Sequence, residues 1–370
     1  MPRRRQKGEG SIYFLEAKKL WVAKIFLPNG KRKVKYGSTK KIVREWLFEQ
    51  QKALHEGIFV DETRITVGEF VDRWFLDVAS LRLRPSTQVS HERIIRNHIR
   101  PTIGHIRLQD LTPLHLQNLY SEKLKGGLSK RTVKYIHTII HQSLDQAQKW
   151  GIVIRNVADA ADSPYPDRKP VEPLTREQVA QLFDALRFDR LYPLYVVFLG
   201  CGLRRGEALG LTVDDIDFEN GVIHVRKTLQ SIRGKGLLLS EPKTEKSRRS
   251  VAMPEYVKEV LKLHLENRTV ESEFVFCTSN GTPFIPRNIL RHFKITLRNA
   301  GLPQSIRIHD LRHTFVSYLL SQNTPPRDVQ EIVGHASFST TVDIYGHLMP
   351  GAKQEAAKKM DGFFNGLSVP

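Results

Sequence analysis

Hydrophobic and polar residues alternate near the N-terminus, which is the pattern of half-buried strands. The three strands that this pattern predicts are Ser11–Leu15, Leu20–Leu27 and Lys31–Tyr36. The segment Pro28-Asn29-Gly30 favours a hairpin turn between the last two, because asparagine and glycine tolerate left-handed backbone. A helix over Thr39–His55 follows. The residues that this helix turns inward are Trp46, Leu47 and Leu54. We therefore expect residues 1–58 to form a small sheet with one helix.

A helical period begins at Thr66. The first apolar stripe, on one face of a helix, comprises Val67, Phe70, Val71, Trp74, Phe75 and Val78. Three further helices are predicted to begin at Pro85, Pro113 and Ser129. Proline suits a helix start because its missing N–H would be unpaired in the first turn. Residues 65–162 are therefore expected to form an all-helical domain, which a linker joins to the first.

Four prolines fall within residues 163–173, and neither a helix nor a central strand tolerates that density. This segment is the clearest domain boundary in the chain. Beyond it, Thr175 and Gln178 fit a capping box at the start of a helix. The strands predicted further on are 222–228, 237–239 and 249–251, with helices before and after them. The sequence thus predicts a multi-domain protein, mainly α with small β-sheets, whose third domain (172–370) is mixed α+β.

The net charge of +19, from 58 basic and 39 acidic residues, indicates a polyanionic partner, of which nucleic acid is the usual one. The excess is concentrated in residues 1–60, which hold 15 basic and 5 acidic side chains. Lys31, Lys33 and Lys35 alternate and so share one face of the third strand. A small sheet with a cationic face is able to enter a DNA groove, although a solvated lysine-rich strand has the same pattern.

The sequence lacks the features of membrane, secreted and zinc-binding proteins. No run of about 18 apolar residues is present, so no transmembrane helix is expected. The basic start, MPRRRQKGEGS, is not followed by the apolar stretch of a secretory signal. Cys201 and Cys277 are far apart and form neither a disulfide framework nor a metal-binding pattern. We expect a cytoplasmic protein with reduced cysteines and no structural zinc.

Two stretches of the third domain carry residue types suited to phosphate chemistry. In LGCGLRRGEALGL, Arg204 follows a glycine-bearing turn, and Glu207 lies one helical turn later, where it could orient the arginine. In IHDLRHT, His309, Arg312 and His313 share a helical face, so that a proton-transfer group and a permanent cation can converge on one phosphate. Taken alone, the first stretch is better explained as an Arg–Glu pair on a helix surface, and the second is also explained as polar residues in the first turn of a helix.

A third stretch, GHASFSTTVDIYGH, contains His335 and Tyr345. An isolated tyrosine is usually a packing residue, but the order and spacing of the three stretches resemble the tyrosine recombinase, or phage-type integrase, family. GLRRGEALGL is similar to the box that supplies the family's first arginine, and HDLRHT to its histidine–arginine box. VGH resembles its late Gly-His motif, and TTVDIYGH its tyrosine box. The resemblance implies catalytic roles for Arg204, His309, Arg312, His335 and Tyr345.

The family also carries a lysine on a β-hairpin between its two arginine boxes. The segment EPKTEKSRRSV is similar to that region. The resemblance implies that Lys243 is this lysine, with Lys246 and Lys235 as alternatives.

The resemblance also implies a different role for each of the three domains. Residues 1–58 would bind arm-type DNA sites, residues 65–162 would bind core sites, and residues 172–370 would be catalytic. Tyr345 would attack a DNA phosphodiester and form a 3′-phosphotyrosine, and two guanidinium groups would make a metal or nucleotide cofactor unnecessary. A homotetramer on double-stranded attachment sites would then exchange strands to integrate or excise a mobile element. A host bending protein and a directionality factor are further partners that this reaction can involve.

Two other functions stay open on the sequence alone. A type IB topoisomerase shares the chemistry but needs no second DNA-reading sheet, and a regulator with a decayed site would not retain all six catalytic residue types. The amphipathic stretch Ala352–Phe364 is expected to dock either on a neighbouring subunit or on its own domain. Asp343 and Glu331 are not expected to be catalytic, because a carboxylate repels phosphate.

Overall fold

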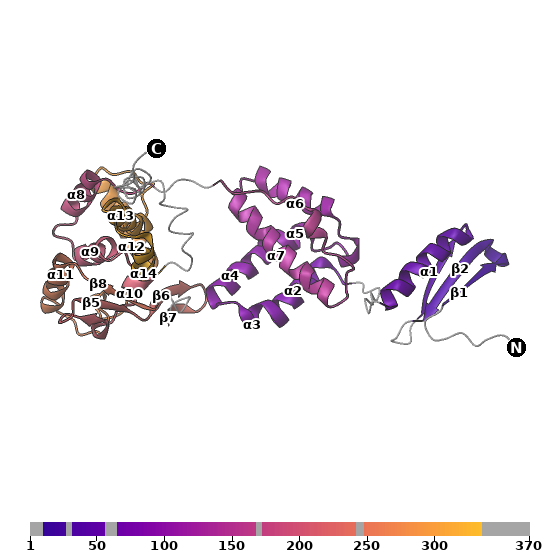
Figure 1. Ribbon diagram of the computed structural model, residues 1–370, viewed down its shortest axis with the longest axis horizontal. Coiled ribbons are helices and arrows are strands. Elements are labelled where there is room, and N and C mark those ends of the chain that lie inside the picture. The colour runs from indigo at the N-terminus through magenta and orange to yellow at the C-terminus, as the bar shows by residue number, and fades with distance from the viewer. Residues whose placement is uncertain (1–9, 27–31, 56–64, 168–171, 242–247, 335–370) are drawn as a thin grey trace, which may run out of the picture. The chain divides into compact units, whose positions relative to one another are not determined.

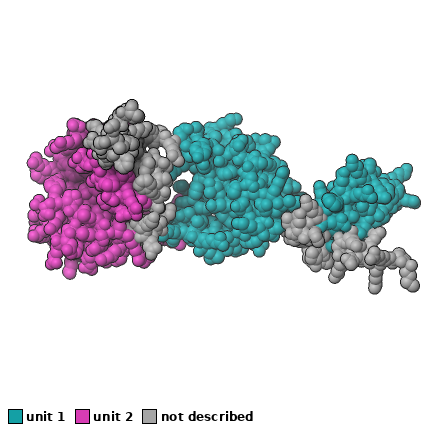
Figure 2. Space-filling view, in the orientation of Figure 1, with its two compact units in different colours: residues 1–167 teal, residues 168–370 magenta. Residues whose placement is uncertain are grey.

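The computed structural model describes residues 10–26, 32–55, 65–167, 172–241 and 248–334, with side chains 52–55 left out (Figure 1). It divides into two compact units, residues 1–167 and residues 168–370 (Figure 2). Several features singled out in the sequence lie outside the described residues. They are the turn at 28–30, Lys31, the Leu54 side chain, Lys243, Lys246, His335, Asp343, Tyr345 and the stretch 352–364.

The N-terminal sheet is antiparallel in the order β1-β2-β3, and one helix covers one of its faces. The elements are β1 (Ser11–Leu15), β2 (Leu20–Phe26), β3 (Arg32–Gly37) and α1 (Lys40–His55). Ala23 and Ile25 of the sheet form an apolar core with Val43 and Leu47 of the helix, and Trp46 packs against it. The predicted sheet, and the inward direction of Trp46 and Leu47, are therefore confirmed.

Lys33 and Lys35 do share a face of β3, but α1 covers this face. They pair with Ile25 and Ala23, the two core residues of β2, and directly paired residues of an antiparallel sheet lie on the same side. The Lys33 ammonium also donates to Gln50 of α1 at 3.5 Å. The predicted shared face of Lys33 and Lys35 is therefore confirmed, and it is the side of the sheet that packs against α1, where Lys33 is half-buried and Lys35 is exposed.

The rest of the first unit consists of helices around one apolar core. The main helices are α2 (Val67–Trp74), α4 (Pro85–Ile94), α6 (Pro113–Lys125) and α7 (Lys130–Lys149). α2 and α4 each continue through a π-helical turn, Phe75–Ala79 and Ile95–Ile99, into the short helices α3 (Ser80–Arg82) and α5 (Arg100–Ile103). Thr66 caps α2 in a capping box with Glu69, so the predicted helix start is confirmed.

The second unit combines helices with two small sheets. The helices are α8 (Arg176–Ala185), α9 (Tyr192–Gly200), α10 (Arg205–Leu209), α11 (Glu255–Glu266), α12 (Pro286–Asn299), α13 (Ile308–Ser321) and α14 (Pro326–Val333). One sheet has the order β4-β5-β8, and β6 and β7 form a hairpin. The strands are β4 (Ile216–Asp217), β5 (Val222–Val225), β6 (Thr228–Ile232), β7 (Gly236–Ser240) and β8 (Arg249–Ala252). The predicted strand 222–228 is therefore two strands, which belong to different sheets.

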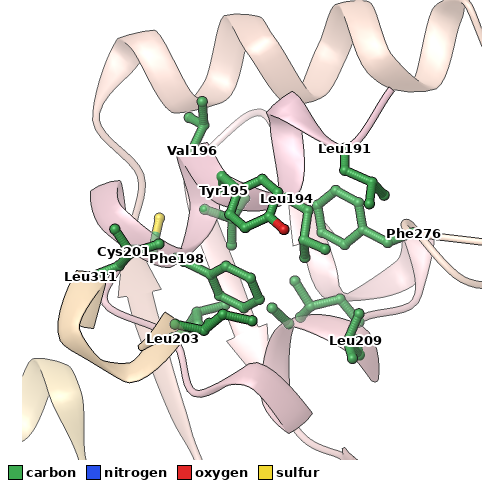
Figure 3. Close-up of a cluster of buried hydrophobic side chains, with 14 of the residues drawn as sticks. Leu191, Leu194, Tyr195, Val196, Phe198, Cys201, Leu203, Leu209, Phe276 and Leu311 are labelled. Carbon is green, nitrogen blue, oxygen red and sulfur yellow. The ribbon is translucent and has the colours of Figure 1, made fainter. Parts of the chain in front are cut away.

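The core of this unit surrounds α9, a helix that is apolar on all sides (Figure 3). Leu203 and Leu311 belong to the same buried cluster. Each immediately precedes an arginine of interest, so the core fixes the backbone from which Arg204 and Arg312 extend. Cys201 is buried there as a free thiol, and burial raises its pKa to about 12. In the part of the chain that the structure describes, no helix has the length and apolarity needed to cross a membrane.

Candidate active site

Arg204 is the N-cap residue of α10, and Glu207 is the third residue of that helix. The Arg204 backbone N–H donates to one Glu207 carboxylate oxygen at 2.9 Å, and its Nη1 donates to the other at 2.6 Å. The Glu207 side chain is only 4% exposed, whereas that of Arg204 is 34% exposed. The carboxylate therefore holds the guanidinium from the protein side and leaves part of it open to a ligand.

Arg312 is almost wholly buried, with 1% of its surface exposed. Its Nη1 donates to the Gly202 carbonyl at 2.6 Å, and its Nη2 donates to the Val333 carbonyl at 2.5 Å. A buried cation is costly unless its donors are used, and these two backbone carbonyls fix the guanidinium plane. Gly202 has φ +60°, and a Cβ at this position would lie 2.4 Å from the Phe315 ring. The carbonyl partner of Arg312 thus depends on a glycine.

His309 and His313 lie one turn apart on α13, with ring centroids 4.6 Å apart in an edge-to-face arrangement. The His309 side chain reaches the surface. The surrounding protein nevertheless excludes part of the water that would solvate an imidazolium. This partial burial, together with the charges of His313, Arg312, Arg204 and Arg307, lowers the pKa of His309 to about 4. His309 is therefore a neutral imidazole at pH 7, able to accept a proton.

The C-terminal end of α14 is where the arginines converge. The last two carbonyls of α14 and the carbonyl of its C-cap, Gly334, accept hydrogen bonds from three guanidinium groups that come from separate segments. Arg249 Nε donates to Ile332 at 2.6 Å, Arg312 Nη2 to Val333 at 2.5 Å, and Arg204 Nη2 to Gly334 at 2.8 Å. The final carbonyls of a helix have no partner within the helix and carry its negative dipole end, so they suit cations.

The position of α14 itself is fixed by packing and by a glycine. Val329 and Val333 of α14 form a small buried cluster with Val316 and Leu320 of α13. Gly334 has φ +65°, the left-handed conformation that ends a helix without steric cost. We call Arg204, Arg249, Arg312 and Glu207 the arginine cluster.

Arg249 is the member of this cluster that the sequence analysis missed. Besides the α14 carbonyl, it contacts both carboxylate oxygens of Glu207, at 3.3 and 3.0 Å. Burial alone would raise the pKa of Glu207, but the ion pairs with Arg249 and Arg204 lower it to about 2. The quoted segment EPKTEKSRRSV contained this arginine, but no local signal indicated what it would contact.

The structure thus brings together Arg204, His309 and Arg312 from the set predicted in the sequence. The remaining three, Lys243, His335 and Tyr345, lie outside the described residues. Lys235, an alternative for the lysine, is exposed in the turn between β6 and β7. Glu331 lies 3.6 Å from Arg327 in an exposed pair on α14. Within the described ranges no group of three or more histidine, cysteine or acidic residues is placed to hold a metal ion.

Two family models match the chain. The phage integrase family model matches residues 172–351, and the model of the phage integrase N-terminal SAM-like domain matches residues 66–124. The chain belongs to the phage integrase family of tyrosine recombinases. It is accordingly a site-specific recombinase that exchanges DNA strands, and the prediction of an enzyme of this class is confirmed.

Individual relatives agree with this assignment. An integrase of Streptomyces ambofaciens is 29% identical over 391 residues, which cover 98% of each chain. The integrase of transposon Tn1549, solved with circular intermediate DNA, has a TM-score of 0.72 at 24% identity and covers 80% of this chain and 99% of its own. A lambda integrase tetramer on a Holliday junction has a TM-score of 0.58 at 16% identity, with 89% and 96% covered. This chain therefore shares its fold with an integrase solved on DNA and with a lambda integrase solved as a tetramer.

Proposed function

We propose that Arg204 and Arg312 of the arginine cluster bind the scissile phosphate of a DNA attachment site and that Tyr345 is the nucleophile. The proposed catalytic residues are Arg204, Lys243, His309, Arg312, His335 and Tyr345. The observation that carries the proposal is the convergence of two arginines at the end of α14, with a histidine on α13 whose pKa their charges help to lower. In the sequence His335 directly follows Gly334, the last residue of this arrangement.

The reaction is a transesterification at phosphorus. The Tyr345 oxygen forms a bond to phosphorus, the P–O5′ bond breaks, and the DNA strand ends in a 3′-phosphotyrosine and a free 5′-hydroxyl. Negative charge gathers on the non-bridging oxygens, where Arg204 and Arg312 stabilise it. Because Arg312 is already oriented by two carbonyls, little reorganisation is needed when this charge develops. Lys243 donates a proton to the departing 5′-oxygen, and His335 donates a hydrogen bond to the phosphate.

His309 is suited to move a proton because it is neutral before the phosphate binds. A tyrosine with an ordinary pKa near 10 needs help to attack at neutral pH. The positive charges around His309 lower its pKa, and a bound phosphate would offset part of that effect. The imidazole therefore becomes a better proton acceptor when substrate is in place.

The N-terminal sheet is proposed to read arm-type DNA through the face that α1 leaves open. Tyr13 and Tyr36 lie in register on either side of Val22 on this face. The Lys24 ammonium lies 4.7 Å from the centre of the Tyr13 ring, and that of Lys18 lies 5.7 Å from the Tyr36 ring. Aromatic rings that hold lysines at the surface of a twisted sheet suit the phosphates that border a groove.

The helical domain, residues 65–162, is proposed to bind the core site. Lys130, Arg131 and Lys134 lie in the first turn and a half of α7, where the helix dipole also favours phosphate. Further exposed bases of this domain are Arg82, Arg84, Arg93, Arg96 and Lys125. Together with the catalytic domain, residues 172–370, it would hold the duplex so that one phosphate reaches the arginine cluster.

The biological role that follows is integration and excision of a mobile element by a homotetramer. The support is the family assignment and the fold shared with a transposon integrase and with a tetrameric lambda integrase. The reaction takes place in the cytoplasm of the bacterial host, on the chromosome, where a bending protein and a directionality factor can contribute. The amphipathic stretch 352–364 would dock on a neighbouring subunit in the tetramer.

The proposal is tested by trapping the covalent intermediate. Protein-bound DNA is recovered by crosslinking and sequenced, and a suicide substrate with a nick beside the mapped cleavage position is made from that site. The full chain should form a denaturation-resistant protein–DNA adduct, and Tyr345→Phe should form none while binding the same DNA. If the unaltered chain binds its site but never forms the adduct, Tyr345 is not the nucleophile. Relaxation of a plasmid without recombinants from two site-bearing plasmids would contradict the integrase role.

A further inference from the structure

Arg249 lies between two parts of the site that are far apart in the sequence. Its Nη1 and Nη2 contact the Glu207 carboxylate of α10, and its Nε donates to the Ile332 carbonyl of α14. The side chains of Arg249 and Glu207 are only 6% and 4% exposed. One guanidinium therefore joins α10, β8 and α14 in a setting from which water is excluded.

The geometry requires an arginine. The planar guanidinium carries donors on both edges, so one group can contact a carboxylate with two nitrogens and a carbonyl with the third. A lysine ammonium could reach either Glu207 or the α14 carbonyl but has no fixed fork to hold both. The bond from Arg249 also completes the row of three carbonyls, Ile332, Val333 and Gly334, whose other two members hold Arg312 and Arg204.

We propose that Arg249 is a positioning residue for strand cleavage, one that sets the spacing between the two phosphate-binding arginines and the C-terminal end of α14. It acts on Arg204 through Glu207, and on Arg312 through the shared end of α14. It also begins β8, the strand that follows the segment containing Lys243. This inference rests on the proposed function, because it concerns the same site.

A purely structural ion pair would lead to different results. Loss of one partner from a buried pair destabilises a protein wherever the pair lies, whereas a positioning residue also changes the chemical step. The pKa of Glu207 provides the measurement that separates the two cases. The charged groups that lower its pKa are Arg249 on β8 and Arg204, the N-cap residue of α10. Without Arg249 the buried carboxylate keeps one cation, so its pKa rises.

The experiment compares Arg249→Met, Arg249→Lys and a matched control, Arg226→Met, in the full chain. Arg226 also pairs with an almost buried carboxylate, Asp215 at 3.3 Å, and Asp215 is 3% exposed. For each variant, DNA affinity, thermal unfolding and the single-turnover rate of adduct formation on the suicide substrate are measured between pH 5 and 8. The Lys variant keeps the positive charge beside Glu207, so a result is available even where the Met variant does not fold.

We expect Arg249→Met to lower the cleavage rate about 100-fold and Arg249→Lys about 10-fold, while DNA affinity changes less than about threefold. In the Met variant the rate should also fall as pH drops through the raised Glu207 pKa, a loss that the unaltered chain does not show. Arg226→Met should be less stable but cleave at the normal rate. Normal cleavage by Arg249→Lys, or an equal loss in Arg226→Met, would overturn the positioning role and leave Tyr345 untouched. Failure of the unaltered chain to cleave would instead refute the proposed function.

Discussion

The arginine cluster and the open face of the N-terminal sheet both present cations, but they hold them in opposite ways. In the cluster, Arg312 is 1% exposed, and its Nη1 and Nη2 each donate to a backbone carbonyl. On the sheet, Lys24 and Lys18 lie over the rings of Tyr13 and Tyr36, two exposed tyrosines. The comparison teaches that a charge fixed by the fold can stabilise a transition state, whereas a solvated charge chiefly raises affinity.

The largest effect on cleavage should come from replacing Arg312, the arginine whose guanidinium is held most rigidly. Arg312→Lys keeps the positive charge but cannot donate to both Gly202 and Val333 in one plane. We expect the single-turnover rate of adduct formation to fall about 10²- to 10³-fold, with DNA affinity changed about twofold at most. A quenched single-turnover reaction on the suicide substrate measures the first, and a gel-shift titration measures the second.

The control for Arg312→Lys is thermal unfolding of the protein without DNA. A variant that unfolds well above the assay temperature and binds DNA normally has lost only the chemical step. Should it instead cleave at the normal rate, fixed orientation of this guanidinium is not needed, and the contrast with the sheet disappears.

A smaller effect is expected when the support of Arg312 is changed and the arginine itself is kept. Gly202→Ala places a Cβ 2.4 Å from the Phe315 ring at a φ of +60°, and we expect the resulting shift of the backbone to disturb the bond from Arg312 to the Gly202 carbonyl. We expect a loss of about 2–4 kcal/mol in the free energy of unfolding and a cleavage rate about 10-fold lower. Urea unfolding and the adduct assay measure the two quantities.

Gly221→Ala is the matched control for this change. Gly221 has φ +66°, but no described atom lies within 4 Å of a Cβ built there. It carries the same backbone cost, about 1–2 kcal/mol, without the clash. If both variants lose cleavage equally, general destabilisation accounts for the effect and the carbonyl of Gly202 has no special part in it.

The same contrast explains what could be predicted from the sequence. Local periodicity located β1 at Ser11–Leu15, and the capping box placed the start of α8, because both signals lie within a few residues. Alternation also showed correctly that Lys33 and Lys35 share a face. It could not show which face α1 would cover, because that choice depends on packing between elements.

The site was predictable for the residues that lie in compact motifs. Arg204, His309 and Arg312 each stand in a short stretch with a helix start, and the structure brings them together. Arg249 was not predictable, because its α14 partner Ile332 lies 83 residues further along the chain. The π-helical turns after α2 and α4 also escaped prediction, since neither contains a glycine or proline, although Pro101 follows the second.

The smallest effect is expected on the open face of the sheet. Lys24→Gln removes one solvated charge beside Tyr13 and should weaken binding to an arm-type site about fivefold at low salt. The slope of log affinity against log salt should become shallower by about 1, because one phosphate contact releases about one counterion. Cleavage of a suicide substrate that lacks arm sites should not change.

Lys33→Gln is the matched control for Lys24→Gln, because it removes one positive charge from the opposite face of the sheet, which α1 covers. Lys33 contacts Gln50 of the helix, so its loss should leave the salt slope within error of the unaltered chain. Equal slopes for the two variants would mean that total charge, and not the open face, governs arm-site binding. A shallower slope for Lys24→Gln alone would place the DNA on the tyrosine face. If Lys33→Gln reduced the salt slope more than Lys24→Gln did, the proposal would be contradicted, and the DNA would instead contact the face that α1 covers.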